Sequence, residues 1–317
     1  MSMSYRRIGT SILLAAAFSA TVTAQHPTSQ SASLDFVRGR PFVMVTVNGK
    51  GPFRFVIDTG TAAEAFVTPE LAERLGLPVT GQVRLTDSSG QGGQRVPMVL
   101  IDSLQVAGVE FTGVKAAQHS LSAVDSNCQG LLGFALFRDY LLSLDYPARR
   151  ISLASGSLVP DGRQSVLPFR MLDGIPVVPL QIGNLQIEAQ IDSGGGGLSL
   201  PEGLASRLRF SYDPVLFSIA ESFSTRFALK GAKLALDVQL GSYTFAQPFV
   251  EINPAFPLAN LGSSAMQNFA FTFDQKSGLV RFESIRQVLH LAETPAPIWL
   301  QNQPTYKAAD ESLVPVG

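Results

Sequence analysis

Residues 53–61 read Phe-Arg-Phe-Val-Ile-Asp-Thr-Gly-Thr, an apolar run that ends in an acid, a hydroxyl residue and a glycine. Alternating apolar side chains at Phe53, Phe55 and Ile57 predict a half-buried strand. Asp58 then stands where the strand leaves the sheet, and Gly60 is free to form a tight turn. A carboxylate at such a position is costly to desolvate unless donors or a second acid share its proton.

A second acid follows a similar strand later in the chain. Residues 187–194 read Ile-Glu-Ala-Gln-Ile-Asp-Ser-Gly, so that Asp192 follows Asp58 by 134 positions. The surroundings repeat as well: a helix signal at 69–75 matches 201–208, Leu132-Gly133 matches Leu261-Gly262, and an Asp-bearing hairpin at 142–153 matches 271–282. Strand, acid, helix and hairpin recur in one order, which indicates an internal duplication.

Composition bounds the class of protein. The chain has 317 residues, 45% hydrophobic and 15% charged, which suffices for a full core in one or two domains. The net charge is −1, without a large basic cluster, which argues against nucleic acid as a partner. The single cysteine, Cys128, excludes an internal disulfide framework and is expected to be a small buried apolar residue.

The first 24 residues resemble an export signal. Arg6 and Arg7 precede an apolar run, and small residues at 22–24 offer a cleavage site before Gln25. We expect an exported mature protein, periplasmic or secreted, without a membrane span after cleavage; an uncleaved anchor is the alternative. Residues 25–33 are polar and predict a flexible leader.

The first repeat predicts strands at 42–47 and 53–57 around the turn signal 48–52, and a short strand at 65–67. Thr68 is expected to cap a helix that starts with Pro69 and stops at Gly76. Two extended arms between Val83 and Val99 flank a Gly-rich tip, which predicts a mobile hairpin. A phosphate-binding loop is the rival interpretation, but no Gly-Lys-Ser/Thr follows the glycines.

The second repeat predicts paired strands at 176–182 and 185–191, a helix near Pro201, and extended segments at 223–240 and 243–250. Turn signals at 155–162 mark the seam between the repeats. The expected units are a signal peptide at 1–24, a leader at 25–33, lobes at 34–158 and 159–284, and a Pro-containing tail at 285–317. The tail shows no sustained period and is either loosely ordered or laid along the core.

Two Asp-Thr/Ser-Gly motifs, apolar-apolar-Gly partners and a Gly-rich hairpin resemble the retropepsin/pepsin clan of aspartic proteases, and residues 53–77 are most similar to bacterial retropepsin-like aspartyl proteases. The resemblance covers about residues 34–284. It implies an all-β fold with short helices, in which two tandem retropepsin-like lobes form a pseudo-two-fold, pepsin-like cleft. It also implies a single-chain monomer that cleaves peptides or unfolded proteins.

The resemblance also assigns roles to individual residues. The catalytic pair falls on Asp58 and Asp192, and two like charges that close share one proton. Thr59 and Ser193 match hydroxyls that bond to the opposite loop, and Gly60 and Gly194 let backbone N–H groups approach the carboxylates. The hairpin tip implies a substrate-covering flap at Ser89, Gly90, Gly92 and Gly93. Neither a cofactor nor a metal is implied.

A difference between the motifs predicts an asymmetric pair. Thr61 can donate its hydroxyl to Asp58, whereas Gly195, in the matching place, has no side chain. A hydrogen bond to the charged form favours ionisation, so the sequence predicts that Asp58 is ionised and that Asp192 keeps the proton.

Three functions remain open at this point. An exported aspartic endopeptidase is favoured by the presence of both acids. A non-catalytic relative that binds peptide or protein is the alternative, with the run Gly195-Gly196-Gly197 as a sign of decay. A packing element of an envelope assembly is the third. Asp145 and Asp274 are expected only to anchor turns, and His26, His119 and His290 are too scattered for a metal site or a Ser-His-Asp triad.

Overall fold

The computed structural model describes residues 29–86, 93–162, 165–221, 226–291, 306–309 and 312–315. Strands dominate and the helices are short, as the sequence predicts. The signal peptide, Ser89, Gly90 and Gly92 lie outside the described residues. Within the described part, no helix is long and apolar enough to cross a membrane.

The first sheet has eight strands and carries Asp58. In spatial order its strands are β2 (Asp35–Val37), β3 (Arg40–Val47), β4 (Lys50–Asp58), β9 (Gly130–Gly133), β5 (Ala65–Val67), β8 (Val109–Gln118), β7 (Gln94–Val106) and β6 (Val79–Leu85). An additional pairing joins β3 to β7, so the sheet curls back on itself. Phe53, Phe55 and Ile57 are buried, which confirms the strand prediction for this stretch.

The second sheet has eleven strands and carries Asp192. Its strands are β17 (Val215–Glu221), β18 (Arg226–Lys233), β21 (Phe249–Asn253), β16 (Leu198–Pro201), β22 (Ala259–Gly262), β15 (Leu185–Asp192), β14 (Ile175–Ile182), β19 (Val238–Leu240), β20 (Tyr243–Phe245) and β25 (Val288–Leu289), with β13 (Arg170–Leu172) paired to β14. Its central pairing resembles that of the first sheet: β15 runs parallel to β22, as β4 does to β9.

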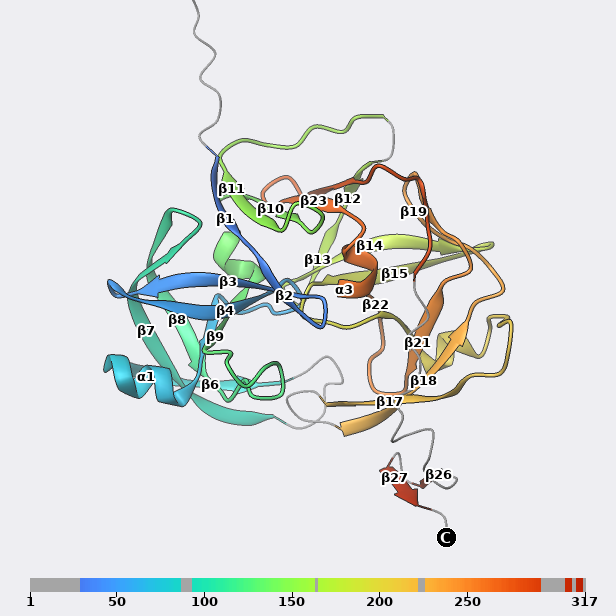
Figure 1. The fold of residues 1–317 in the computed structure, drawn as a ribbon, viewed down its shortest axis with the longest axis horizontal. Coiled ribbons are helices and arrows are strands. Elements are labelled where there is room, and N and C mark those ends of the chain that lie inside the picture. Colours follow the sequence, from blue (N-terminus) through green and yellow to red (C-terminus); the bar gives the residue numbers. More distant parts are fainter. Residues whose placement is uncertain are drawn as a thin grey trace, which may run out of the picture.

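A third, six-stranded sheet takes strands from both repeats. Its order is β1 (Gln30–Ser33), β11 (Arg150–Ala154), β10 (Leu141–Asp145), β23 (Ala270–Asp274), β24 (Leu279–Glu283) and β12 (Val166–Pro168). At its centre β10 pairs with β23, and Leu142 lies opposite Phe273. Figure 1 shows this sheet above the first and second sheets, which lie to either side below it. The two halves of the chain are therefore tied together by backbone hydrogen bonds.

Helices α1 (Pro69–Leu75) and α2 (Glu202–Ala205) begin near the predicted places, and the described part also contains α3 (Ser263–Met266) and the 3-10 turn η1 (Phe134–Phe137). The Thr68 hydroxyl accepts a hydrogen bond from the Leu71 amide at 3.2 Å, and Gly76 ends α1 in the left-handed conformation at φ 65°. Both cap predictions are confirmed.

The predicted leader differs from expectation, whereas part of the tail follows one of the two alternatives left open, since it lies along the second sheet. Gln30–Ser33, part of the predicted leader, forms β1 and pairs with β11, because strand pairing satisfies its backbone despite its polar side chains. In the predicted tail, Val288–Leu289 extends the second sheet beside β20, and β26 (Tyr306–Ala309) pairs with β27 (Ser312–Pro315). The Leu289 side chain is buried, which periodicity over two residues could not reveal.

Candidate active site

Asp58 and Asp192 occupy corresponding positions at the ends of β4 and β15. Asp58 lies opposite Gly133 of the parallel strand β9, and Asp192 lies opposite Gly262 of β22. Both strands are central in their sheets, so their backbones are paired up to the acids. The carboxyl group of each acid lies against the loop that carries the other acid.

The two acid-bearing loops bond to each other reciprocally through Thr59 and Ser193. The Thr59 hydroxyl donates to the Ile191 carbonyl at 2.8 Å and accepts from the Ser193 amide at 3.0 Å. The Ser193 hydroxyl donates to the Ile57 carbonyl at 2.8 Å and accepts from the Thr59 amide at 3.0 Å. Both side chains are completely buried. These four bonds fix the distance between the loops.

The motif glycines are required for close packing rather than for backbone freedom. A Cβ on Gly60 would lie 2.5 Å from Cγ of Asp192, and one on Gly194 would lie 2.4 Å from Cγ of Asp58. The tight turn predicted at Gly60 is present, because the Thr61 amide donates to the Asp58 carbonyl at 3.3 Å, but neither glycine has a left-handed φ. The glycine of each loop therefore packs against the acid of the other loop.

Different sets of donors surround the two carboxylates. Asp58 accepts from the Gly60 amide at 2.9 Å and from the Thr61 hydroxyl at 3.0 Å. On Asp192, Oδ1 accepts from the Gly194 amide at 2.9 Å and the Gly195 amide at 2.8 Å. Its Oδ2 accepts from the Asn260 side-chain amide at 2.9 Å. Asp192 thus has three donors and Asp58 has two.

The structure gives no support to the predicted asymmetry of the pair. Burial raises the pKa of Asp58 well above its usual range, and the charge of the neighbouring Asp192 adds to the rise. The hydrogen bonds from Thr61 and Gly60 only lessen that rise. The sequence argument counted the Thr61 hydroxyl but missed two donors to Asp192, the Asn260 side chain and the Gly195 amide. The number of donors therefore does not favour Asp58 as the ionised member.

Other groups around the pair were also missed from the sequence. The Arg40 guanidinium of β3 donates from Nε to the Gly194 carbonyl at 2.6 Å. Tyr146 is buried nearby; burial raises the pKa of its phenol, and the charges of Asp192 and Asp58 raise it further. Among the described residues its hydroxyl has no hydrogen-bond partner. Aligning the two halves of the sequence could have identified Asn260, because this polar residue matches the apolar Leu131.

Only the stem of the predicted flap is described. Strands β6 and β7 pair from Val79 opposite Val99 to Leu85 opposite Gln94. Gly93 precedes β7 at φ 128°, a conformation that favours glycine. The hairpin therefore has extended arms, as predicted, and a flap role for its tip stays a prediction.

Other candidate residues have structural explanations. The carboxylates of Asp145 and Asp274 accept turn amides, from Ala148 at 2.8 Å and from Ser277 at 3.1 Å. Cys128 is buried, which raises the pKa of its thiol, and its Sγ contacts the Gly130 carbonyl at 3.1 Å. In the described part of the chain, no group of three or more His, Cys, Asp or Glu residues could hold a metal ion.

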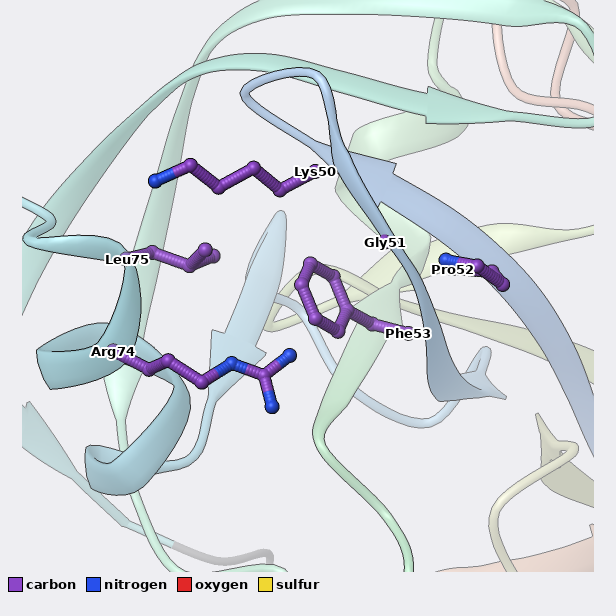
Figure 2. A pocket seen from close by; sticks show the side chains of 6 residues that line it. All are labelled: Lys50, Gly51, Pro52, Phe53, Arg74 and Leu75. Atoms are coloured by element: carbon purple, nitrogen blue, oxygen red, sulfur yellow. The ribbon is translucent and has the colours of Figure 1, made fainter.

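Two surface hollows lie apart from the acids. Figure 2 shows one of about 200 Å³ between the start of β4 and the end of α1, where Arg74 and Leu75 face Phe53. It adjoins the opposite end of β4 from Asp58. A second hollow, of about 940 Å³, is lined by residues of β14, β15 and α2, including Ile187 and Leu204. Neither hollow contains Asp58 or Asp192.

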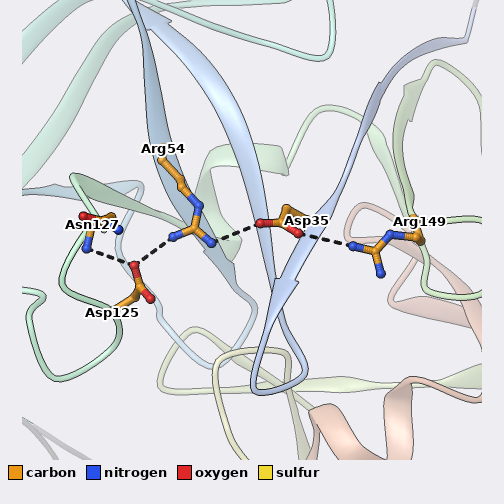
Figure 3. Close-up of polar contacts among 5 residues, drawn as sticks. All are labelled: Asp35, Arg54, Asp125, Asn127 and Arg149. Carbon is orange, nitrogen blue, oxygen red and sulfur yellow. Dashed lines mark hydrogen bonds and ion pairs between the residues drawn. The ribbon is translucent and has the colours of Figure 1, made fainter.

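A polar network braces the first sheet beside the acid-bearing strand. Figure 3 shows Arg54 of β4 between Asp125 and Asp35, with Asp35 also contacting Arg149. The Arg54–Asp125 pair measures 2.8 Å, and each side chain is 19% exposed. The Arg54 guanidinium also stacks on Phe42, 3.8 Å from the ring centroid. This network connects β2, β4 and the turn after β10 without touching the acids.

The sequence comparison identifies the class of the acid-bearing fold. Residues 43–136 match a family model described as aspartyl protease. The match runs from β3 through Asp58 and Gly133 to η1, so this region is similar to aspartyl proteases. No curated protein matches the chain.

Proposed function

We propose that this protein is an exported aspartic endopeptidase in which Asp58 and Asp192 together activate a water molecule. One observation carries the proposal: reciprocal hydrogen bonds of Thr59 and Ser193 hold two strand-end acids from different sheets together, and each acid packs against the glycine of the other loop. The aspartyl protease match to residues 43–136 supports a peptidase in general, and the second acid supplies the partner that the mechanism needs.

The donors around each acid suggest the division of labour. Asp192, with three donors, is the ionised member and accepts a proton as water attacks the scissile carbonyl carbon. Asp58 carries the shared proton and donates a hydrogen bond to the carbonyl oxygen, where negative charge develops. The tetrahedral diol then collapses: a proton passes to the nitrogen, the C–N bond breaks, and a carboxyl group and an amine leave.

The reciprocal bonds support this role because they hold both acids without a substrate. Thr59 and Ser193 are buried and fully bonded across the loops, so the pair is preorganised. In the proposed enzyme both lobes belong to one chain, and a monomer therefore suffices. Lobes at 34–158 and 159–284 remain part of the proposal, as does export directed by residues 1–24.

The alternative of a decayed binding protein has less support. It rested on the glycine run at 195–197, but a Cβ at Gly195 would lie 2.4 Å from Nδ2 of Asn260, and one at Gly197 would lie 2.5 Å from Oε1 of Glu251. Both glycines make room for polar side chains beside the acids. Such packing favours a maintained site over a degenerate one.

The test uses the purified chain from residue 25 to 317 and an unfolded, carboxymethylated protein as substrate. We expect cleavage at internal peptide bonds that a statine-containing peptide, which mimics the tetrahedral diol, inhibits competitively. Tight binding of that peptide without cleavage at any pH from 3 to 8 would favour the binding protein instead. Cleavage that the peptide does not inhibit would contradict the proposed site.

A further inference from the structure

Asn260 occupies a position that is apolar in the first sheet. Leu131 of β9 lies opposite Val56 and Phe66 of its neighbouring strands. In the second sheet Asn260 of β22 lies opposite Gln190 and Ser199 in the same pattern of one parallel and one antiparallel partner. The strand register alone therefore equates Asn260 with Leu131.

The change extends to a whole patch of the sheet. Val56, Phe66, Leu131 and Ala117 belong to one buried apolar cluster of the first sheet. Their counterparts are Gln190, Ser199, Asn260 and Glu251, all polar. Gln190 and Ser199 are largely buried, at 8% and 7% exposed. The second sheet thus replaces an apolar cluster with a polar one directly beside Asp192.

The side chain of Asn260 does for Asp192 what the Thr61 hydroxyl does for Asp58. Its Nδ2 donates to Oδ2 of Asp192 at 2.9 Å, and the Thr61 hydroxyl donates to Oδ2 of Asp58 at 3.0 Å. The residue that matches Thr61 is Gly195, which has no hydroxyl to give. The donor to Oδ2 therefore comes from the loop after the acid in the first sheet and from a neighbouring strand in the second.

The hydrogen bond between Asn260 and Asp192 requires glycine at position 195. A Cβ at Gly195 would lie 2.4 Å from Nδ2 of Asn260 and 2.5 Å from Oδ2 of Asp192, far inside contact distance. A threonine in the place that matches Thr61 would therefore clash with both partners of this bond.

The buried Asn260 amide is also incompletely satisfied. Among the described residues its Oδ1 has no hydrogen-bond partner, although the atom is shielded from solvent. A buried acceptor without a partner costs stability, so an apolar residue like Leu131 would be the more stable choice. The bond from Nδ2 to Asp192 is the contact that explains its presence.

We propose that Asn260 is a positioning residue that replaces the hydroxyl missing at position 195, orients the Asp192 carboxylate and makes the two acids inequivalent. The proposal rests on the proposed function for its effect on catalysis, but not for the hydrogen bond itself. The chargeable groups that face Asp192 from neighbouring elements are Asp58 after β4, Arg40 on β3 through the Gly194 carbonyl, Tyr146 after β10, and Glu251 on β21 beside Gly197. None of them donates to Oδ2 in place of Asn260 among the contacts described here.

The experiment removes the Asn260 amide by a substitution of nearly the same size and shape. Asn260→Leu should lower kcat/KM about fivefold, the effect of losing one hydrogen bond, and should move the acid limb of the pH–rate profile upward.

Two further variants serve as controls. Asn260→Ser keeps a polar group but cannot reach Asp192, and it should shift the acid limb as Asn260→Leu does. Asn268→Leu removes an amide in the turn after α3 that donates to the Ala265 carbonyl at 3.1 Å, and it should leave the limb in place. An unchanged limb in both Asn260 variants would overturn the proposal.

A readout independent of catalysis separates this proposal from the proposed function. Carbon-13 NMR of the aspartate carboxyl groups follows the titration of the pair directly, and its two midpoints belong to the coupled pair. Asn260→Leu should raise the lower midpoint. If the wild-type chain cleaves nothing but this midpoint moves, the proposed function fails while the role of Asn260 stands. If it does not move, the role of Asn260 fails whatever the activity.

Discussion

Replacing Thr59 with valine tests the reciprocal bonds that hold the two acid loops together. Valine has the same branched shape as threonine and removes only the hydroxyl. Two buried backbone groups then lose their partners, the Ile191 carbonyl and the Ser193 amide. Thr59 is completely buried, so water cannot replace the lost partner.

The expected cost follows from those two groups. Each buried backbone group left unpaired costs about 1–3 kcal/mol, so Thr59→Val should lower the free energy of unfolding by roughly 2–6 kcal/mol. That is a large part of the roughly 5–15 kcal/mol that stabilises a typical protein. Urea unfolding followed by far-ultraviolet circular dichroism measures the change through the transition midpoint.

A matched exposed threonine provides the control. Thr80 donates its hydroxyl to the Met98 carbonyl at 3.3 Å, but on the surface, so Thr80→Val should change the free energy by no more than about 0.5 kcal/mol. If Thr59→Val were as mild as Thr80→Val, the reciprocal bonds would not hold the loops, and the preorganisation argument would fail.

Two more predictions concern stability against pH and assembly. Burial raises the pKa of Glu251 to about 7, so the folded protein holds a proton that the unfolded chain releases near 4.5. The free energy of unfolding should therefore fall as pH rises from about 4.5 to 7. Glu251→Gln should make this slope shallower in urea midpoints measured across the range, and the raised pKa of Asp58 accounts for the slope that remains. Because both acids belong to one chain, specific activity should stay constant on hundredfold dilution, and a steep fall would indicate a dimeric enzyme instead.

Much of the site follows from local sequence. The strand before Asp58, the cap at Thr68 and the stop at Gly76 depend on residues adjacent in the chain, and periodicity and cap chemistry report such neighbours well. Because the sequence pattern recurs, the same predictions could be made for the second half, where β14 and β15 form at the expected residues. Predicting the two strand-end acids, Asp58 and Asp192, required only this local information.

What escaped prediction depends on contacts between distant strands. Asn260 reaches Asp192 only because β22 and β15 run parallel in one register, and no local pattern contains that register. The same holds for the need for glycine at position 60, which comes from Asp192 across the loops. The sequence argument about which acid ionises missed the Asn260 donor because it compared only the residues next to each acid.

The central claim, that Asp58 and Asp192 act as one water-activating pair, is tested most directly by kcat/KM of Asp58→Asn and Asp192→Asn on one peptide substrate. Asparagine keeps the shape but cannot accept the water's proton or share it, so each variant should lose at least on the order of a hundredfold in kcat/KM while keeping its circular dichroism spectrum. Asp145→Asn, at a hairpin turn away from the pair, should retain wild-type activity. A folded Asp58→Asn or Asp192→Asn variant that keeps most of its activity would contradict the account.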